Sequence, residues 1–221
     1  MKVSTARIAS LIACLAAATA STAGTVAGRV ELIEKGGKKA DDVSEAVVWV
    51  EGVKVKPQPL TAEIRMKGKA FTPHVLAIPV GGTVKFPNDD AIFHNVFSVS
   101  GDNRFDLDLY KKPKAGVWTA QHPGVVRVYC NIHPQMSAII VVHDNPFFTM
   151  AGRDGRFALE GVPAGSYRVT AWHERADPVS LDVVVPAEGQ ATTNLTLDAS
   201  KFRRARHKNK HGQDYPAREK Y

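Results

Sequence analysis

The chain has 221 residues, of which 44% are hydrophobic, and this length suits two small domains or one large one. Its net charge of +7 is concentrated at the ends: residues 201–221 carry eight Lys or Arg against two acidic residues, and Lys2 and Arg7 add two more positive charges. The body is therefore nearly neutral, and we expect no nucleic-acid partner. Frequent proline and glycine between valine-rich runs favour an all-β chain.

Residues 1–23 have the pattern of an export signal. A basic start is followed by an apolar stretch over residues 8–18 and then by small residues that offer cleavage sites up to residue 23. The apolar stretch is too short to span a membrane. We therefore expect a periplasmic protein, secreted through an N-terminal signal peptide. The segment also fits a lipoprotein cleavage box in which Cys14 would carry the lipid, and that alternative stays open.

Cleavage of the signal would leave Cys130 as the one cysteine of the mature chain. No intramolecular disulfide could then form, so a lone thiol in an oxidising compartment needs another role. Metal ligation is one such role. A small buried hydrophobic residue is the alternative.

The predicted strands are short and separated by turn residues such as Gly81-Gly82 and Asp154-Gly155, the second of which predicts a hairpin turn. In chain order the strands cover residues 25–32, 46–50, 71–78, 83–88, 94–99, 105–110, 125–130, 138–142, 166–173, 180–185 and 192–197. This spacing predicts β-sandwiches or barrels. Residues 146–198 hold only about five strands, which is few for a sandwich with both faces covered.

Three metal-ligand side chains follow one another at steps of three, namely Cys130, His133 and Met136. A thiolate, an imidazole and a thioether together suit copper, because sulfur favours Cu(I) and imidazole binds both oxidation states. A blue-copper site needs one further imidazole from elsewhere in the chain. His94 is the best candidate, and His74, also in a plausible strand, is the alternative.

These residues resemble the cupredoxin family of amicyanin- and plastocyanin-like blue copper proteins over residues 57–145. The resemblance is carried by Gly82-x-Val84-x-Phe86-x-Asn88, by His94-Asn95 and by the loop Cys130-x-x-His133-Pro134-x-Met136, which is most similar to the loop of amicyanin. It implies a cupredoxin Greek-key β-sandwich.

The resemblance also implies one type 1 copper per chain, held by His94, Cys130 and His133 with Met136 as a weak axial ligand. Asn95 would then support the Cys130 loop. The edge of His133 would reach the surface through an apolar patch and pass electrons to a partner.

A second stretch, from Asp154 through Val162-Pro163-Ala164-Gly165 to Val169, resembles the carboxypeptidase-regulatory-like or transthyretin-like β-sandwich. That family begins with a pattern similar to residues 24–26 and 46–50. We therefore predict that residues 24–56 and 146–198 form one discontinuous, transthyretin-like sandwich into which the cupredoxin is inserted. Residues 199–221 are predicted to be a basic, disordered tail.

The sequence thus predicts an exported type 1 copper protein that carries single electrons between periplasmic redox partners, such as a dehydrogenase or a cytochrome. It is not expected to be an enzyme, because multicopper oxidases need histidine on both sides of the cysteine and Cys130 lies between Tyr129 and Asn131. Copper storage or delivery, and a structural β-sandwich with a vestigial metal site, are alternatives.

Two further segments of the sequence can be interpreted either as purely structural or as functional. The run Trp172-His173-Glu174 is interpreted as structural, with a metal or catalytic role as the alternative. The basic tail either solubilises the protein or docks on an acidic partner or a membrane surface.

Overall fold

The computed structural model describes residues 23–204 and 206–215. The predicted signal segment before residue 23, with Cys14, and residues 216–221 of the tail lie outside this part. The described chain is all-β, as predicted, and its helices are two single 3₁₀ turns, η1 (Lys35–Gly37) and η2 (Gly101–Asn103). Within the described residues no helix has the length and apolarity needed to cross a membrane.

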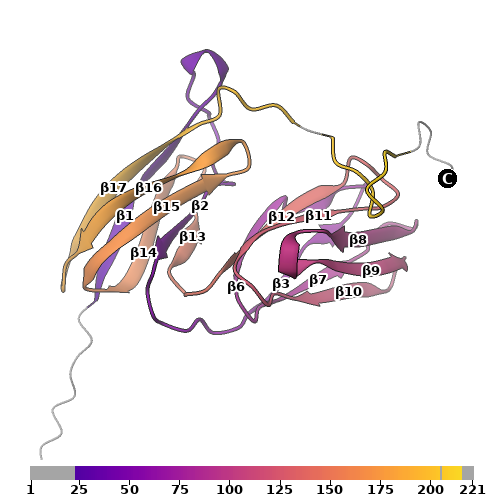
Figure 1. The fold of residues 1–221 in the computed structure, drawn as a ribbon, viewed down its shortest axis with the longest axis horizontal. Coiled ribbons are helices and arrows are strands. Elements are labelled where there is room, and N and C mark those ends of the chain that lie inside the picture. Colours follow the sequence, from indigo (N-terminus) through magenta and orange to yellow (C-terminus); the bar gives the residue numbers. More distant parts are fainter. Residues whose placement is uncertain (1–22, 205, 216–221) are drawn as a thin grey trace, which may run out of the picture.

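Strands from the two ends of the chain form one sandwich, which we call the outer sandwich (Figure 1). One sheet has the order β14-β1-β17, and the facing sheet has the order β13-β2-β15-β16. The strands are β1 (Ala23–Ile33), β2 (Val47–Glu51), β13 (Phe148–Met150), β14 (Arg156–Pro163), β15 (Gly165–His173), β16 (Ala176–Val185) and β17 (Gln190–Asp198). Alternation along β1 buries Val26, Val30 and Leu32 in the core between the sheets.

The Asp154-Gly155 turn does not close a hairpin, so that expectation was wrong. The preceding strand β13 pairs with β2, whereas the following strand β14 pairs with β1 in the other sheet. Gly155 has a φ of +84°, and a side chain there would come within 2.1 Å of the Val30 carbonyl oxygen. The pattern therefore specified a tight turn but not which sheet would receive the next strand.

The intervening strands form a second pair of packed sheets, which we call the central unit. A five-stranded sheet has the order β6-β12-β11-β8-β9, a three-stranded sheet has the order β10-β7-β3, and β4 pairs with β5. The strands are β3 (Thr61–Glu63), β4 (Arg65–Met66), β5 (Phe71–Thr72), β6 (Val75–Pro79), β7 (Thr83–Pro87), β8 (His94–Ser98), β9 (Phe105–Tyr110), β10 (Ala115–Thr119), β11 (Gly124–Tyr129) and β12 (Ser137–His143). Phe86 and Val128 lie in its core.

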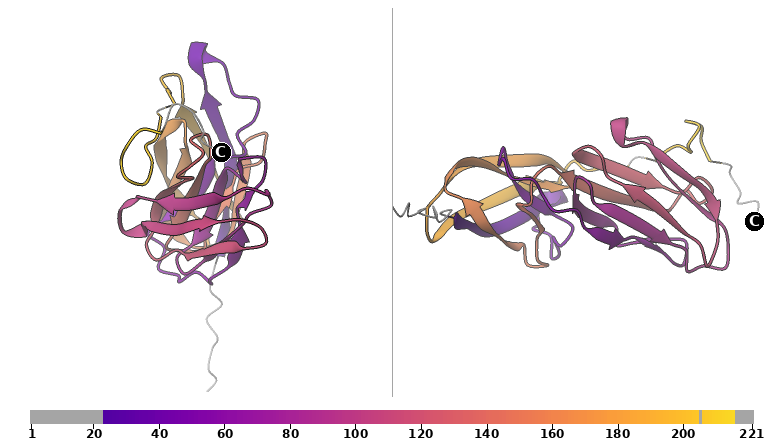
Figure 2. Two further views of the ribbon diagram at one scale, coloured as in Figure 1. Left: turned by 90° about the vertical axis from the view of Figure 1, so that its right-hand side faces the viewer. Right: turned by 90° about the horizontal axis from the view of Figure 1, so that it is seen from below.

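The outer sandwich and the central unit lie side by side along the long axis of the molecule (Figure 2). A small apolar cluster joins them: Val47 and Trp172 of the outer sandwich pack with Val75, Ile139 and Val141 of the central unit. Burial of these side chains stabilises the contact by the hydrophobic effect. The metal-ligand residues predicted from the sequence all lie in the central unit.

Candidate metal centre

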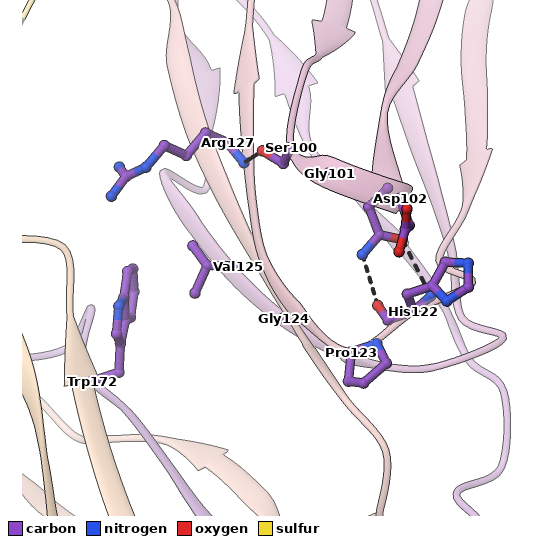
Figure 3. A pocket seen from close by; sticks show the side chains of 10 residues that line it. Ser100, Gly101, Asp102, His122, Pro123, Gly124, Val125, Arg127 and Trp172 are labelled. Carbon is purple, nitrogen blue, oxygen red and sulfur yellow. Dashed lines mark hydrogen bonds between the residues drawn. The ribbon is translucent and has the colours of Figure 1, made fainter.

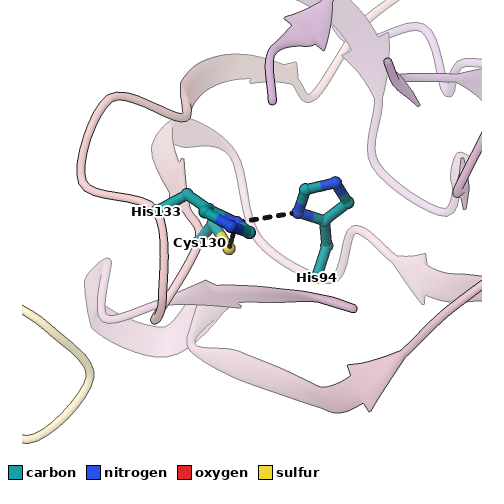
Figure 4. A group of neighbouring side chains, drawn as sticks. All are labelled: His94, Cys130 and His133. Atoms are coloured by element: carbon teal, nitrogen blue, oxygen red, sulfur yellow. Dashed lines mark hydrogen bonds between the residues drawn. The ribbon is translucent and has the colours of Figure 1, made fainter. Parts of the chain in front are cut away.

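Strand pairing brings His94, Cys130 and His133 together inside the central unit (Figure 4). His94 is the first residue of β8, and Cys130 directly follows β11, which pairs with β8. The Nδ1 atoms of His94 and His133 are 2.9 Å apart, and Cys130 Sγ is 3.6 Å from His133 Nδ1. All three side chains are buried, and their donor atoms lie within 4.8 Å of one another.

Met136 returns to the same part of the core. It is fully buried and belongs to the hydrophobic cluster that contains Cys130. Two backbone hydrogen bonds close the loop: Met136 N–H donates to the His133 carbonyl at 3.0 Å, and Cys130 N–H donates to the Met136 carbonyl at 3.3 Å. The loop therefore presents its sulfur and nitrogen side chains from one compact turn.

Asp90 orients the His94 ring, and sequence reasoning missed this residue. The Nε2–H of His94 donates to Asp90 Oδ2 at 2.8 Å, which leaves Nδ1 facing Cys130 and His133. Burial tends to raise the pKa of Asp90, but hydrogen bonds from Lys69 N–H, Gly68 N–H and His94 outweigh it and lower that pKa. A carboxylate on the second nitrogen is the usual way to orient a ligating histidine. The signal was an acidic residue four positions before His94.

Backbone N–H groups surround the Cys130 sulfur. Burial raises the pKa of the Cys130 thiol, while hydrogen bonds from the backbone N–H groups of Asn95, Ile132 and His133 oppose this rise. Such donors favour the thiolate, which is the form that binds metal.

Asn95 lies beside Cys130, and its backbone N–H is one of the donors that oppose the rise in the pKa of the thiol. The side-chain Nδ2 donates to Asp106 Oδ1 at 2.6 Å and to the Asp108 carbonyl at 3.0 Å, so it fixes β9 against β8. Asp106 is exposed and at the same time accepts this hydrogen bond.

The surface near the ligands is apolar, but His133 does not reach it. His133 is 2% exposed, contrary to the expectation that its edge would be accessible. The residues next to the two histidines are the exposed ones: Phe93 is 48% exposed, Ile92 is 40% exposed, and Pro134 is exposed. The burial of this one ring depends on the packing of the whole loop, which the sequence does not specify.

The basic tail lies across the ligand loop, although it was predicted to be disordered. His207 stacks on Tyr129 with ring centroids 4.0 Å apart and donates from Nε2 to the Pro134 carbonyl at 2.8 Å. The Tyr215 hydroxyl donates to the Cys130 carbonyl at 2.8 Å. The prediction of disorder assumed that a segment must bury apolar side chains in order to dock on a folded domain. Here ring stacking and hydrogen bonds hold the segment in place.

Lys210 makes two further contacts between the tail and the central unit. Its backbone N–H donates to Asn131 Oδ1 at 3.0 Å, and its Nζ lies 2.5 Å from Asp106 Oδ2. Because Asp106 also accepts from Asn95, the tail is linked to the residue whose backbone contacts the Cys130 sulfur.

Two other histidines of the described chain lie apart from this group. His74, the alternative fourth ligand, groups with Glu45 and Glu174 and not with Cys130. His122 is exposed and lines an open depression of about 490 Å³ beside Trp172 (Figure 3). Polar groups there satisfy one another: Asn103 Nδ2 donates to the His122 carbonyl, and Arg127 N–H donates to Ser100 Oγ. This depression carries no group of metal ligands within the described residues.

Comparison with known proteins gave structural likenesses only. No protein-family model matches the chain, and a search of curated proteins found no match. The chain is similar to a copper-containing nitrite reductase from Thermus scotoductus SA-01, with 30% identity over 44% of this chain and 25% of that chain and a TM-score of 0.36. It thus spans about a quarter of the length of that protein.

Two smaller proteins are matched over almost their whole length. A reduced amicyanin variant has 22% identity over 43% of this chain and 98% of that chain, with a TM-score of 0.36. A purple cupredoxin from Nitrosopumilus maritimus has 22% identity over 52% of this chain and 98% of that chain, with a TM-score of 0.31. The all-β class and the packed sheets of the central unit, expected from the sequence, are present.

Proposed function

We propose that this chain is an exported type 1 copper protein that carries single electrons between periplasmic redox partners. The observation that supports it best is the buried group of His94 Nδ1, Cys130 Sγ and His133 Nδ1, with Met136 in the same core. Two imidazoles, a thiolate and a thioether form the donor set of blue-copper electron-transfer sites. The residues present therefore fit one copper ion per chain.

In this proposal His94, Cys130 and His133 hold the ion, and Met136 is the weak fourth ligand. Copper, when bound, supplies the one-electron exchange between Cu(I) and Cu(II). The protein contributes a fixed arrangement of donors. Asp90 sets the His94 ring, and the backbone N–H groups of Asn95, Ile132 and His133 hold the sulfur. A site that moves little suits both oxidation states, and these hydrogen bonds and the apolar surroundings tune its potential.

We place the docking surface for a redox partner, such as a dehydrogenase or a cytochrome, on the exposed apolar residues Ile92, Phe93 and Pro134. The tail crosses the same loop, so a partner there would contact the tail or displace it. Its excess of Lys and Arg favours an acidic partner or a membrane surface. Export to the periplasm rests on the sequence of residues 1–23.

We also propose that residues 24–56 and 146–198 are one discontinuous, transthyretin-like sandwich into which residues 57–145 are inserted. The support is strand pairing across the insertion: β1 pairs with β14 and β17, and β2 pairs with β13 and β15. The inserted unit would then be held at both ends by one folded body.

The test is to load the full chain with Cu(II) and record visible and EPR spectra with reversible reduction. An intense thiolate-to-copper band that bleaches and returns supports the proposal. Cys130→Ser should abolish the band, whereas Met136→Leu should keep it and shift the potential, because only the weakly bound thioether would be lost. Tight Cu(I) binding without a stable Cu(II) form would indicate storage or delivery instead. A colourless protein that prefers zinc would indicate a vestigial site.

A further inference from the structure

A second group of metal-ligand side chains lies where the outer sandwich meets the central unit. Glu45 precedes β2, Glu174 follows β15, and His74 precedes β6, so three separate segments contribute. One ligand atom from each lies within 4.8 Å of the other two. All three residues are partly buried. Ligand atoms from the outer sandwich and from the central unit thus come together, although the three residues are far apart in the sequence.

We propose that Glu45, His74 and Glu174 form a second metal site, for a divalent first-row ion such as zinc, that links the outer sandwich to the central unit. One imidazole nitrogen and two carboxylate oxygens, with no sulfur, is a donor set that suits Zn²⁺ and does not favour Cu(I). The two carboxylates would balance the charge of the ion. Three protein ligands leave a position for water.

The His74 ring is already oriented as a metal ligand. Its Nδ1–H donates to the Ser137 carbonyl at 3.0 Å, so Nε2 points at the carboxylates. Glu174 Oε2 lies 2.9 Å from this Nε2. A backbone carbonyl that fixes the second nitrogen is a common support of a ligating histidine. Because donors around a tetrahedral zinc lie about 3.3 Å apart, only a small adjustment of the three side chains is needed.

Glu45 distinguishes this group from an ordinary His–Glu ion pair. One carboxylate is sufficient to pair with His74, and Glu174 already does so. The side chain of Glu45 makes no hydrogen bond or salt bridge with any residue that the structure describes, yet its carboxylate lies within 4.8 Å of both partners. A second carboxylate beside the first costs free energy through like-charge repulsion. A divalent cation would convert that repulsion into attraction.

The site has an entrance. His74 and Glu174 line a cavity of about 1090 Å³ between the central unit and the tail, so an ion and its water can reach them. The guanidinium Nη2 of Arg204 lies 3.7 Å from Glu174 Oε1, and the Arg204 side chain is 77% exposed. Such an exposed ion pair is weak, and an ion could displace it at little cost. The Ser137 carbonyl that orients His74 follows Met136 directly, which places the second site next to the ligand loop.

The experiment counts zinc on the copper-loaded full chain by calorimetry and by metal analysis after gel filtration. We expect one Zn²⁺ per chain in addition to copper. Glu45→Gln and Glu174→Gln should each weaken zinc binding at least tenfold and leave the visible copper band unchanged. Glu160→Gln, at an exposed position of β14, is the matched control and should bind zinc normally. The double variant His207→Gln, His211→Gln removes tail histidines and should also retain zinc.

The proposal is overturned if the copper-loaded chain takes up no zinc, or if Glu45→Gln and Glu174→Gln bind it as tightly as the parent. It is also overturned if the tail variant alone loses the zinc. The same titration on Cys130→Ser keeps this test separate from the copper proposal, because that variant lacks the thiolate of the first site. One zinc per chain lost on Glu45→Gln in that background would support the second site even if no copper bound at the first.

Discussion

Replacing Asn95 by Ala should destabilise the central unit without removing the copper site. Asn95 is 1% exposed and connects β8 to β9 through its Nδ2 group. Its Oδ1 is buried without a hydrogen-bond partner among the described residues. The backbone N–H that contacts the Cys130 sulfur remains in the variant. Stability and colour should therefore respond differently to this one substitution.

The change in the free energy of unfolding follows from two lost hydrogen bonds and from the removal of one buried oxygen that has no hydrogen-bond partner among the described residues. The hydrogen bond to the Asp106 carboxylate contributes about 2 kcal/mol, because charged acceptors are stronger, and the bond to the Asp108 carbonyl contributes about 1 kcal/mol. Removing the unpartnered Oδ1 returns about 1–2 kcal/mol. The net cost is about 1–2 kcal/mol. Asn95→Asp should cost more, since it places a second carboxylate against Asp106.

Native-state hydrogen exchange of the copper-free protein is the suitable assay, because a chain with two folded units need not unfold in one step. Amides of β11 and β12 that exchange by unfolding of the central unit should exchange about 5- to 30-fold faster in Asn95→Ala. Peptides of β15 and β16 serve as an internal control and should change less. Unchanged exchange in β11 and β12, or loss of the blue band in the copper-loaded variant, would refute this account of Asn95.

Two further predictions concern the interface between the units and the tail. His143 lies between the rings of Trp49 and Phe148, and burial lowers its pKa to about 4 despite the nearby Asp144, so it is neutral in the fold. Since the unfolded chain binds this proton near pH 6.5, His143 alone should lower stability by up to about 3 kcal/mol as the pH drops from 6.5 to 4. His143→Phe should make this part of the pH profile of unfolding shallower, and the remaining slope includes His173, whose pKa burial also lowers to about 4. Asn131→Ala should speed exchange of the Lys210 amide about fivefold, the equivalent of about 1 kcal/mol for one hydrogen bond, as followed by NMR. Asn194→Ala, a remote acceptor on β17, is the control, and equal Lys210 exchange in the parent and in Asn131→Ala would argue against the docked tail.

The strand pattern was largely readable from the sequence because alternation of apolar and polar residues follows directly from the geometry of a β-strand. The strands over residues 83–87, 94–98 and 105–110 are found within one residue of the expectation. Short strands such as β3, β4 and β10 were missed, since two to five residues with mixed polarity give little periodic signal. The turn between β13 and β14 was misjudged for another reason: the residues of a turn do not determine which strand the following segment pairs with.

The residues of the candidate metal centre were likewise only partly predictable from the sequence. The sequence singled out His94, Cys130 and His133 from donor type and spacing, and the structure brings their donor atoms within 4.8 Å of one another. Copper ligation by these residues and Met136 stays a proposal. Asp90 lies only four residues before His94, but the sequence does not show that the chain between them bends so that the carboxylate meets the ring. The burial of His133 and the tail resting on Tyr129 depend on contacts between segments that are distant in the chain, and whether such segments meet is decided by tertiary packing. The meeting of Glu45 and Glu174 with His74 is of this kind: no local pattern marks it, and only the docking of the two sandwiches through Val47, Trp172 and Ile139 brings those residues together.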